Sequence, residues 1–163
     1  MKLKSYKGFT IIEVVLVLAI AGLIFLMVLI ALPNMQRSQR DTARRNDYAA
    51  FTANITSYLT NNNGHLPGAC TPATENSICA QPEKYVNPDG EDSAGHDYII
   101  TVKAYDASMS AMAEMAQSDD PQIWLVTGAQ CGTNQGTVEF SSGNRDFAVL
   151  GQLETGVFCQ DNV

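Results

Sequence analysis

The sequence has few basic residues beyond Arg45. Residues 46–163 hold fifteen acidic and three basic residues, a formal charge of −12, whereas the other seven Lys and Arg residues precede residue 46. A surface of this charge repels the nucleic-acid backbone, so we expect the distal part to bind no nucleic acid. The arginines from Arg37 to Arg45 form a basic cluster, which we interpret as the end of a helix that leaves a membrane.

Motifs for metal, cofactor or catalytic chemistry are also lacking. The sequence has no Cys-x-x-Cys pair and no Gly-x-Ser-x-Gly motif, and none of its glycines stands in a phosphate-cradling motif. Both histidines, His65 and His96, stand in turn-rich stretches. We therefore expect no enzyme and no cofactor, and we interpret Met109, Met112 and Met115 as packing residues.

One acidic stretch, "NPDGEDSAGHD", calls for a separate interpretation. Its carboxylates could supply hard oxygen ligands to calcium, and they belong to Asp89, Glu91, Asp92 and Asp97. Their spacing is not that of an EF-hand, and acidic loops are commonly solvated. We predict no metal here and keep calcium as the alternative.

Polar side chains are absent from the nineteen residues between Val14 and Leu32. A run of this length crosses a bilayer as a helix. A secretory signal peptide would have a shorter apolar core, and here the run continues well beyond the Ala19-Ile20-Ala21 cleavage pattern. A plain signal anchor explains the length but leaves the carboxylate of Glu13 unexplained.

The residues before the run suggest a third interpretation. A basic leader, Met1 to Lys7, is followed by Gly8 and then by Phe9-Thr10-Ile11-Ile12-Glu13. This order resembles the class III leader of type IV prepilins and pseudopilins, and the resemblance covers the chain to about Asn63. It implies leader cleavage between Gly8 and Phe9, N-methylation of Phe9, and helix flexibility at Gly22. Pro33 departs from the common pattern, in which the proline comes a few residues earlier, so the bend can lie at either residue.

The chemistry of Glu13 favours this interpretation independently. A carboxylate at membrane depth costs about 2.5–3.5 kcal/mol unless it finds a partner. Cleavage at Gly8 creates one, the α-amino group of Phe9, which helical spacing places on the neighbouring turn. In a filament the amine of an adjacent subunit could take its place, so that Glu13 would set the assembly register. The alternative is that Glu13 simply reaches the headgroups.

All four cysteines follow the apolar run. An even number on one side of a membrane anchor predicts two disulfides in an oxidising compartment. Three pairings are possible, and the sequential one closes the most local loops. The residues are Cys70, Cys79, Cys131 and Cys159.

The remaining pattern predicts an α+β fold. Apolar residues at helical spacing continue from Asn34 to about Thr60, and Asn63-Gly64 should stop the helix. Charged residues between Arg37 and Asp47 would form its solvated flanks. We expect this long helix to pack on an antiparallel sheet of about four strands. The predicted strands are Tyr98–Tyr105, Gln122–Thr127, Gly136–Phe140, Phe147–Leu153 and Val157–Cys159.

We therefore expect a leader (1–8), a transmembrane and filament-core helix (9–33), an amphipathic helix (34–63) and an extracytoplasmic head (64–163). The resemblance implies a structural subunit of a type IV pilus, membrane-anchored first and extracellular after polymerisation. Implied partners are other pilins or further copies, a prepilin peptidase and methyltransferase, and an inner-membrane assembly platform. One alternative is a pseudopilin of a type II secretion or DNA-uptake system. Another is a monomeric membrane-anchored binding domain.

Overall fold

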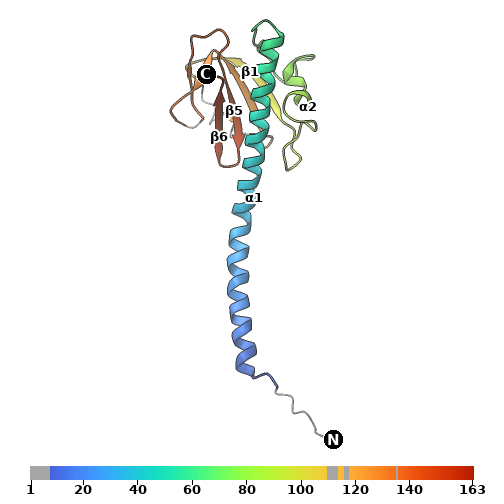
Figure 1. Cartoon of the computed structure of the whole chain (residues 1–163), viewed down its shortest axis with the longest axis vertical. Helices are drawn as coiled ribbons and strands as arrows, with labels where there is room; N and C mark the ends of the chain where they lie inside the picture. Colours follow the sequence, from blue (N-terminus) through green and yellow to red (C-terminus); the bar gives the residue numbers. More distant parts are fainter. Residues whose placement is uncertain (1–7, 110–113, 116–117, 135) are drawn as a thin grey trace. The chain divides into compact units, whose positions relative to one another are not determined.

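The computed structural model describes residues 8–109, 114–115, 118–134 and 136–163 (Figure 1). The basic leader residues Met1–Lys7 and the predicted packing residue Met112 lie outside the described residues. The chain divides into two compact units, Met1–Ser38 and Gln39–Val163, and we call the second one the head. The longest element, helix α1 (Ile11–Asn61), contributes residues to both units.

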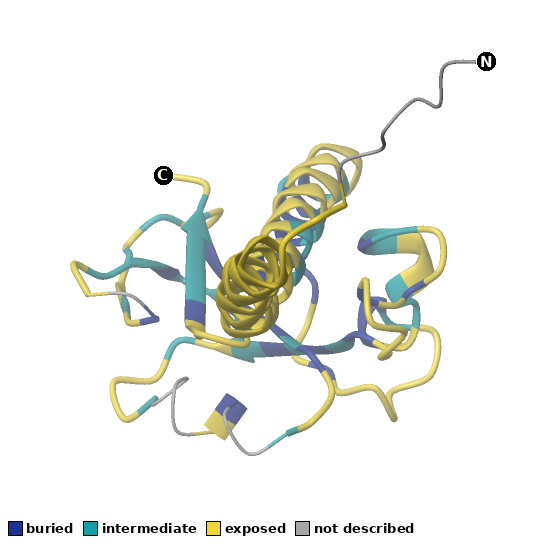
Figure 2. Ribbon diagram, turned by 90° about the horizontal axis from the view of Figure 1, so that it is seen from below, coloured by how far each residue is buried: buried dark blue, intermediate teal, exposed yellow. Residues whose placement is uncertain are grey.

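In the first unit, every described residue is exposed, and Figure 2 draws the turns of α1 in this unit in yellow. The exposed side chains are almost all apolar, because the sequence offers no polar residue between Val14 and Leu32. By length and composition, α1 is able to cross a membrane. An apolar helix without a buried face needs lipid or other helices around it.

Within the head, α1 buries one face. Four apolar residues at three- and four-residue spacing, Tyr48, Phe51, Ile55 and Leu59, enter the core, as the sequence pattern predicted. Burying each such side chain contributes about 1.5–3 kcal/mol. The helix then ends where predicted, because Asn63 and Gly64 take positive φ angles of 56° and 79° and the Gly64 amide bonds the Leu59 carbonyl at 2.7 Å.

A four-stranded sheet in the order β1-β2-β5-β6 lies against this helix face (Figure 1). Its strands are β1 (Ile99–Ala104), β2 (Gln122–Thr127), β5 (Phe147–Leu153) and β6 (Gly156–Asp161). Pairs β2–β5 and β5–β6 are antiparallel, whereas β1–β2 is parallel. The sheet is therefore mixed. Two parallel neighbours need a long connection between them, and residues 105–121, between β1 and β2, are long enough to provide it.

The opposite face of the sheet carries a second cluster. Trp124, Val126 and Leu150 are buried there together with Met115, so the packing role predicted for this methionine agrees with the structure. A small antiparallel sheet of β3 (Ala129–Cys131) and β4 (Val138–Phe140) adds to the cover. The prediction missed β3, and it placed the residues of β4 in a longer strand of the main sheet.

The segment between α1 and β1 contains two short helices, η1 (Ile78–Ala80) and α2 (Pro82–Tyr85). A disulfide joins Cys70 to Cys79 in this segment, and a second one joins Cys131 to Cys159 between β3 and β6. The protein thus has the sequential pairing. The predicted fold class, α+β with a long N-terminal helix packed on a four-stranded sheet, is confirmed, with the one parallel pair as a difference.

Candidate processing and assembly site

The predicted cleavage bond lies in accessible backbone. Gly8, Phe9 and Thr10 adopt no regular secondary structure and are exposed, and Phe9 has 85% of its surface accessible. A side chain at residue 8 would meet nothing within 4 Å. A protease needs an accessible segment outside regular secondary structure, and these residues provide one.

Helix α1 begins immediately after this segment, two residues later than the sequence suggested. The Thr10 carbonyl accepts hydrogen bonds from the amides of Glu13 at 3.1 Å and Val14 at 3.4 Å. In addition, the Thr10 hydroxyl donates to the Glu13 carboxylate at 3.4 Å. Glu13 thus stands in the first turn, where the helix dipole favours a negative charge.

The hydrogen bond from the Thr10 hydroxyl to the Glu13 carboxylate was not predicted from the sequence. A threonine three residues before a glutamate at a helix start is a recognised capping signal, and "TIIE" carries it. The hydroxyl is the partner that the structure gives to the Glu13 carboxylate among the described residues. One long hydrogen bond compensates a carboxylate in lipid only in part.

The family comparison matches residues 3–29 to the prokaryotic N-terminal methylation motif. The N-terminal segment is a class III prepilin leader. Leaders of this class belong to type IV pilins and pseudopilins, so the recognition based on Gly8 to Glu13 is confirmed. Neither the curated proteins nor the solved structures gave a match to the chain.

The predicted flexible positions are both inside α1. Pro33 stands within the helix, and a Cβ at Gly22 would meet nothing within 4 Å. Both residues belong to the first unit. Their role in bending stays a prediction.

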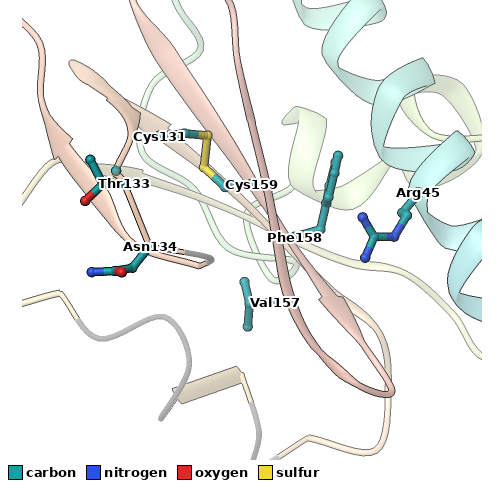
Figure 3. Close-up of a pocket in the computed structure, with 8 residues that line it drawn as sticks. Arg45, Cys131, Thr133, Asn134, Val157, Phe158 and Cys159 are labelled. Atoms are coloured by element: carbon teal, nitrogen blue, oxygen red, sulfur yellow. A yellow bond between two sulfur atoms is a disulfide. The ribbon is translucent and has the colours of Figure 1, made fainter.

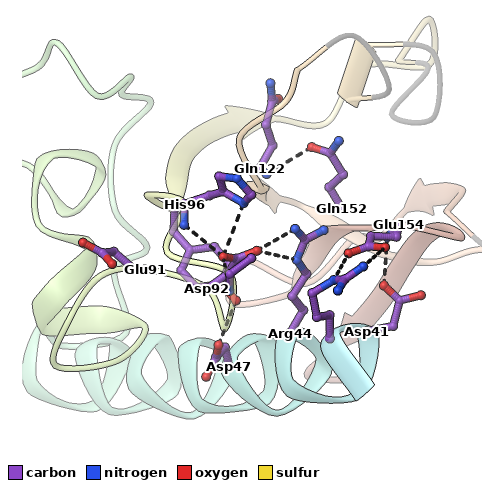
Figure 4. A network of polar contacts seen from close by, with 12 residues as sticks. Asp41, Arg44, Asp47, Glu91, Asp92, His96, Gln122, Gln152 and Glu154 are labelled. Carbon is purple, nitrogen blue, oxygen red and sulfur yellow. Dashed lines mark hydrogen bonds and ion pairs between the residues drawn. The ribbon is translucent and has the colours of Figure 1, made fainter. Parts of the chain in front are cut away.

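Within the head, α1 is held to the loops and the sheet by charged residues that we had expected to be solvated. That prediction was wrong for Asp41 and Arg44, which keep 6% and 5% of their surface exposed. Arg44 donates to one carboxylate oxygen of Asp92 from Nε at 3.0 Å and from Nη2 at 2.6 Å (Figure 4). The other Asp92 oxygen accepts the amides of Ala94 at 2.9 Å and His96 at 3.0 Å.

These contacts set the ionisation of Asp92. Burial opposes its charged form, but the His96 amide, the Arg44 guanidinium and the Ala94 amide outweigh burial and hold the pKa of Asp92 below its usual range. The loop around Asp92 is therefore fastened to the helix by a charged side chain of α1.

A second anchor joins α1 to the turn between β5 and β6. Asp41 accepts the Glu154 amide at 2.8 Å and the Thr155 hydroxyl at 2.6 Å. Arg40 pairs with the Glu154 carboxylate. Six residues after Asp41, Asp47 accepts the Tyr98 hydroxyl at 2.7 Å.

The calcium candidates do not converge. Asp92 is occupied by Arg44, whereas Asp89, Glu91 and Asp97 are exposed, and Glu91 points away from Asp92 (Figure 4). Within the described residues, no group of three or more His, Cys, Asp or Glu side chains could hold a metal ion. A guanidinium thus lies against the one buried carboxylate of this loop.

Catalytic groups do not assemble in the described part of the head either. All four cysteines are in disulfides, and His96 lies beside Asp92, with 3.5 Å between Nδ1 and Oδ1. The methylation motif indicates a structural subunit rather than an enzyme. With the disulfides and the apolar helix, it supports the predicted features of a pilin-type chain, namely methylation, a transmembrane helix and disulfide bonds.

Proposed function

We propose that this chain is a structural subunit of a type IV pilus or pilus-like surface filament. The observation that carries the proposal is a methylation motif, residues 3–29, that continues into the apolar part of α1, where no described residue is buried and one carboxylate stands. The motif supports processing, and the exposed helix supports assembly. The head would then form the outer surface of the filament.

Assembly through the helix is inexpensive in free energy. An apolar helix that leaves lipid for a bundle of similar helices keeps an apolar environment and gains packing. Glu13 keeps one long hydrogen bond to Thr10 in the isolated chain. The amine of a processed Phe9, from the same or a neighbouring subunit, would complete its pairing and would favour one axial register over others.

The proposal divides the chain into a leader (1–8), a membrane and filament-core helix (9–33), an amphipathic helix (34–63) and an extracytoplasmic globular part (64–163), which is the head without its helix. The two disulfides support a location of the head in an oxidising compartment, outside the inner membrane, because disulfides persist in such compartments. The partners would be a prepilin peptidase and methyltransferase, an inner-membrane assembly platform, and further pilin subunits. The precursor would be a single-pass membrane protein.

The first experiment is intact-mass analysis of the membrane-extracted full chain. We expect loss of Met1 to Gly8 and gain of one methyl group. An uncut chain would refute the proposal and would favour a membrane-anchored binding domain.

The second experiment separates a pilus from a shorter assembly. Surface filaments are sheared from the cells, imaged, and identified by peptide mass. We expect peptides of residues 39–163 in the filament fraction. A processed and methylated chain that stays entirely in the membrane fraction would identify a pseudopilin instead.

A further inference from the structure

The two edges of the four-stranded sheet are treated differently. At the β1 edge, Cys70 pairs with Val102 through two backbone hydrogen bonds of 3.2 and 3.0 Å, so another segment of the chain pairs with this edge at one position. At the β6 edge, no backbone group of the described residues forms such a pair. An open edge presents a row of unpaired N–H and C=O groups.

The hairpin register identifies these groups. β5 and β6 are joined by a two-residue turn, and Leu153 faces Gly156 at its base. Such a closing pair is hydrogen-bonded, and bonded and non-bonded pairs alternate along an antiparallel ladder. The amides and carbonyls of Val157, Cys159 and Asp161 therefore point to the free edge.

A hollow runs along this edge. It is lined by residues from both faces of β6, since Phe158 lies on the α1 side and Val157 and Cys159 on the side of β3 (Figure 3). The rest of the lining is Arg45, Cys131, Gly132, Thr133 and Asn134. A hollow that touches both faces of an edge strand contains the space in which a further strand would lie.

Arg45 gives this hollow a charge preference. Its guanidinium lies over the Phe158 ring, 5.1 Å from the centroid, and within the part of the chain that the structure describes it pairs with no carboxylate. The lining contains no Asp or Glu, although residues 46–163 carry a formal charge of −12. An exposed arginine held by an aromatic ring is well placed to bind a carboxylate.

Two contacts hold one wall of the hollow against β6. The Cys131–Cys159 disulfide ties the wall to β6, and the Asp161 carboxylate accepts the Cys131 amide at 2.7 Å. A preformed edge loses little conformational entropy when an extended peptide binds it.

We propose that the free edge of β6 binds an extended acidic segment of another protein by strand addition, with Arg45 holding a carboxylate of that segment. A second copy of this chain is a poorer occupant. Its acidic stretch at residues 88–97 consists of turns, bends and one bridge between Glu91 and Asp97, and Cys70 already pairs with β1 at Val102. The edge binds its partner whether or not the chain forms filaments, so the processing experiment and this one can fail separately.

The test uses the full chain in detergent micelles and a fluorescent seven-residue peptide in which Thr alternates with Val around one central Glu. A second peptide has Gln in place of Glu. Two further peptides carry N-methyl groups on one or the other alternate set of backbone amides, because only one set can pair with β6. Binding is measured by fluorescence anisotropy, and amide hydrogen exchange is followed at Val157, Cys159 and Asp161.

We expect the Glu peptide to bind and to slow exchange at these three amides, with one N-methylated peptide losing at least tenfold in affinity. Arg45→Gln should weaken the Glu peptide by up to about fivefold and leave the Gln peptide unchanged. Arg145→Gln removes the same charge from another exposed part of the head and should change neither.

Several results would overturn the proposal. They are no binding of the Glu peptide at millimolar concentration, equal binding of both N-methylated peptides, or equal weakening of the Glu and Gln peptides by Arg45→Gln. Protection of the three amides that rises with the concentration of the chain alone would assign the edge to a second copy and would overturn it as well.

Discussion

The first unit and the head handle charge in opposite ways. Residues 8–38 place one carboxylate on an exposed apolar helix and give it a 3.4 Å hydrogen bond to Thr10. The head encloses Asp41, Arg44 and Asp92 and gives each of them short contacts from distant parts of the chain. The head thus satisfies its buried charges with short contacts inside the chain, whereas the described residues give the Glu13 carboxylate a single long hydrogen bond.

The largest expected effect is that of breaking the buried ion pair. Asp92→Ala leaves the Arg44 guanidinium enclosed without its partner, and we expect the free energy of unfolding of the head to fall by about 3–5 kcal/mol. Urea unfolding of the full chain in micelles, followed by the fluorescence of the buried Trp124, measures this loss. Asp89→Ala, at an exposed carboxylate of the same loop, should change it by no more than about 0.5 kcal/mol. Equal losses in both variants would show that the pair does not hold the loop.

A smaller loss is expected where α1 meets β5. A Cβ on Gly151 would lie 2.2 Å from the Tyr48 ring, so Gly151→Ala forces the helix and the sheet apart. We expect a loss of about 1–3 kcal/mol in the same unfolding assay. Gly68→Ala is the matched control, because its Cβ would meet nothing within 4 Å. An unchanged Gly151→Ala head would mean that Tyr48 is not packed on this backbone.

Acidification should weaken the head through Asp92. Because its pKa is lower in the folded chain than in the unfolded one, Asp92 contributes stability above about pH 4. That contribution is lost as the pH falls through the folded value. We expect the difference in unfolding free energy between the natural chain and Asp92→Asn to shrink as the pH is lowered from neutrality. A difference that stays constant with pH would contradict this assignment.

The smallest effect on the head is expected from the charge in the first unit. Glu13→Ala should leave the unfolding free energy of the head within about 0.5 kcal/mol. It should nevertheless reduce N-methylation or filament yield, which intact mass and sheared-filament preparations measure. Val14→Ala, an apolar neighbour, should retain both. Normal filaments with normal methylation from Glu13→Ala would refute its role in assembly.

Local patterns predicted the elements of this protein well. The apolar run, the Asn63-Gly64 stop and the bounds of the strands Gln122–Thr127 and Phe147–Leu153 depend on neighbouring residues, and the structure agrees with all of them. The same is true of the leader, because its signal is a short contiguous motif.

Contacts between residues far apart in the sequence could not be predicted from these local patterns. Arg44 and Asp92 are 48 positions apart, and Asp41 and Glu154 are 113 apart, so a helical stripe of charges looked solvated. Alternation along β1 and β2 fixes which side chains face inward but not the direction of the strands, so their parallel pairing was not foreseen. Three-residue β3 is too short to show a period.

The anchors near the start of the head also have a mechanical meaning. Asp41, Arg44 and Tyr48 lie within two turns of α1, and they reach the β5–β6 turn, the Asp92 loop and the Gln152 carbonyl. A pull along the helix axis therefore loads three contacts side by side rather than one after another. Since contacts loaded together share the force, the sheet and loops of the head should separate from α1 together at high tension and not one loop at a time.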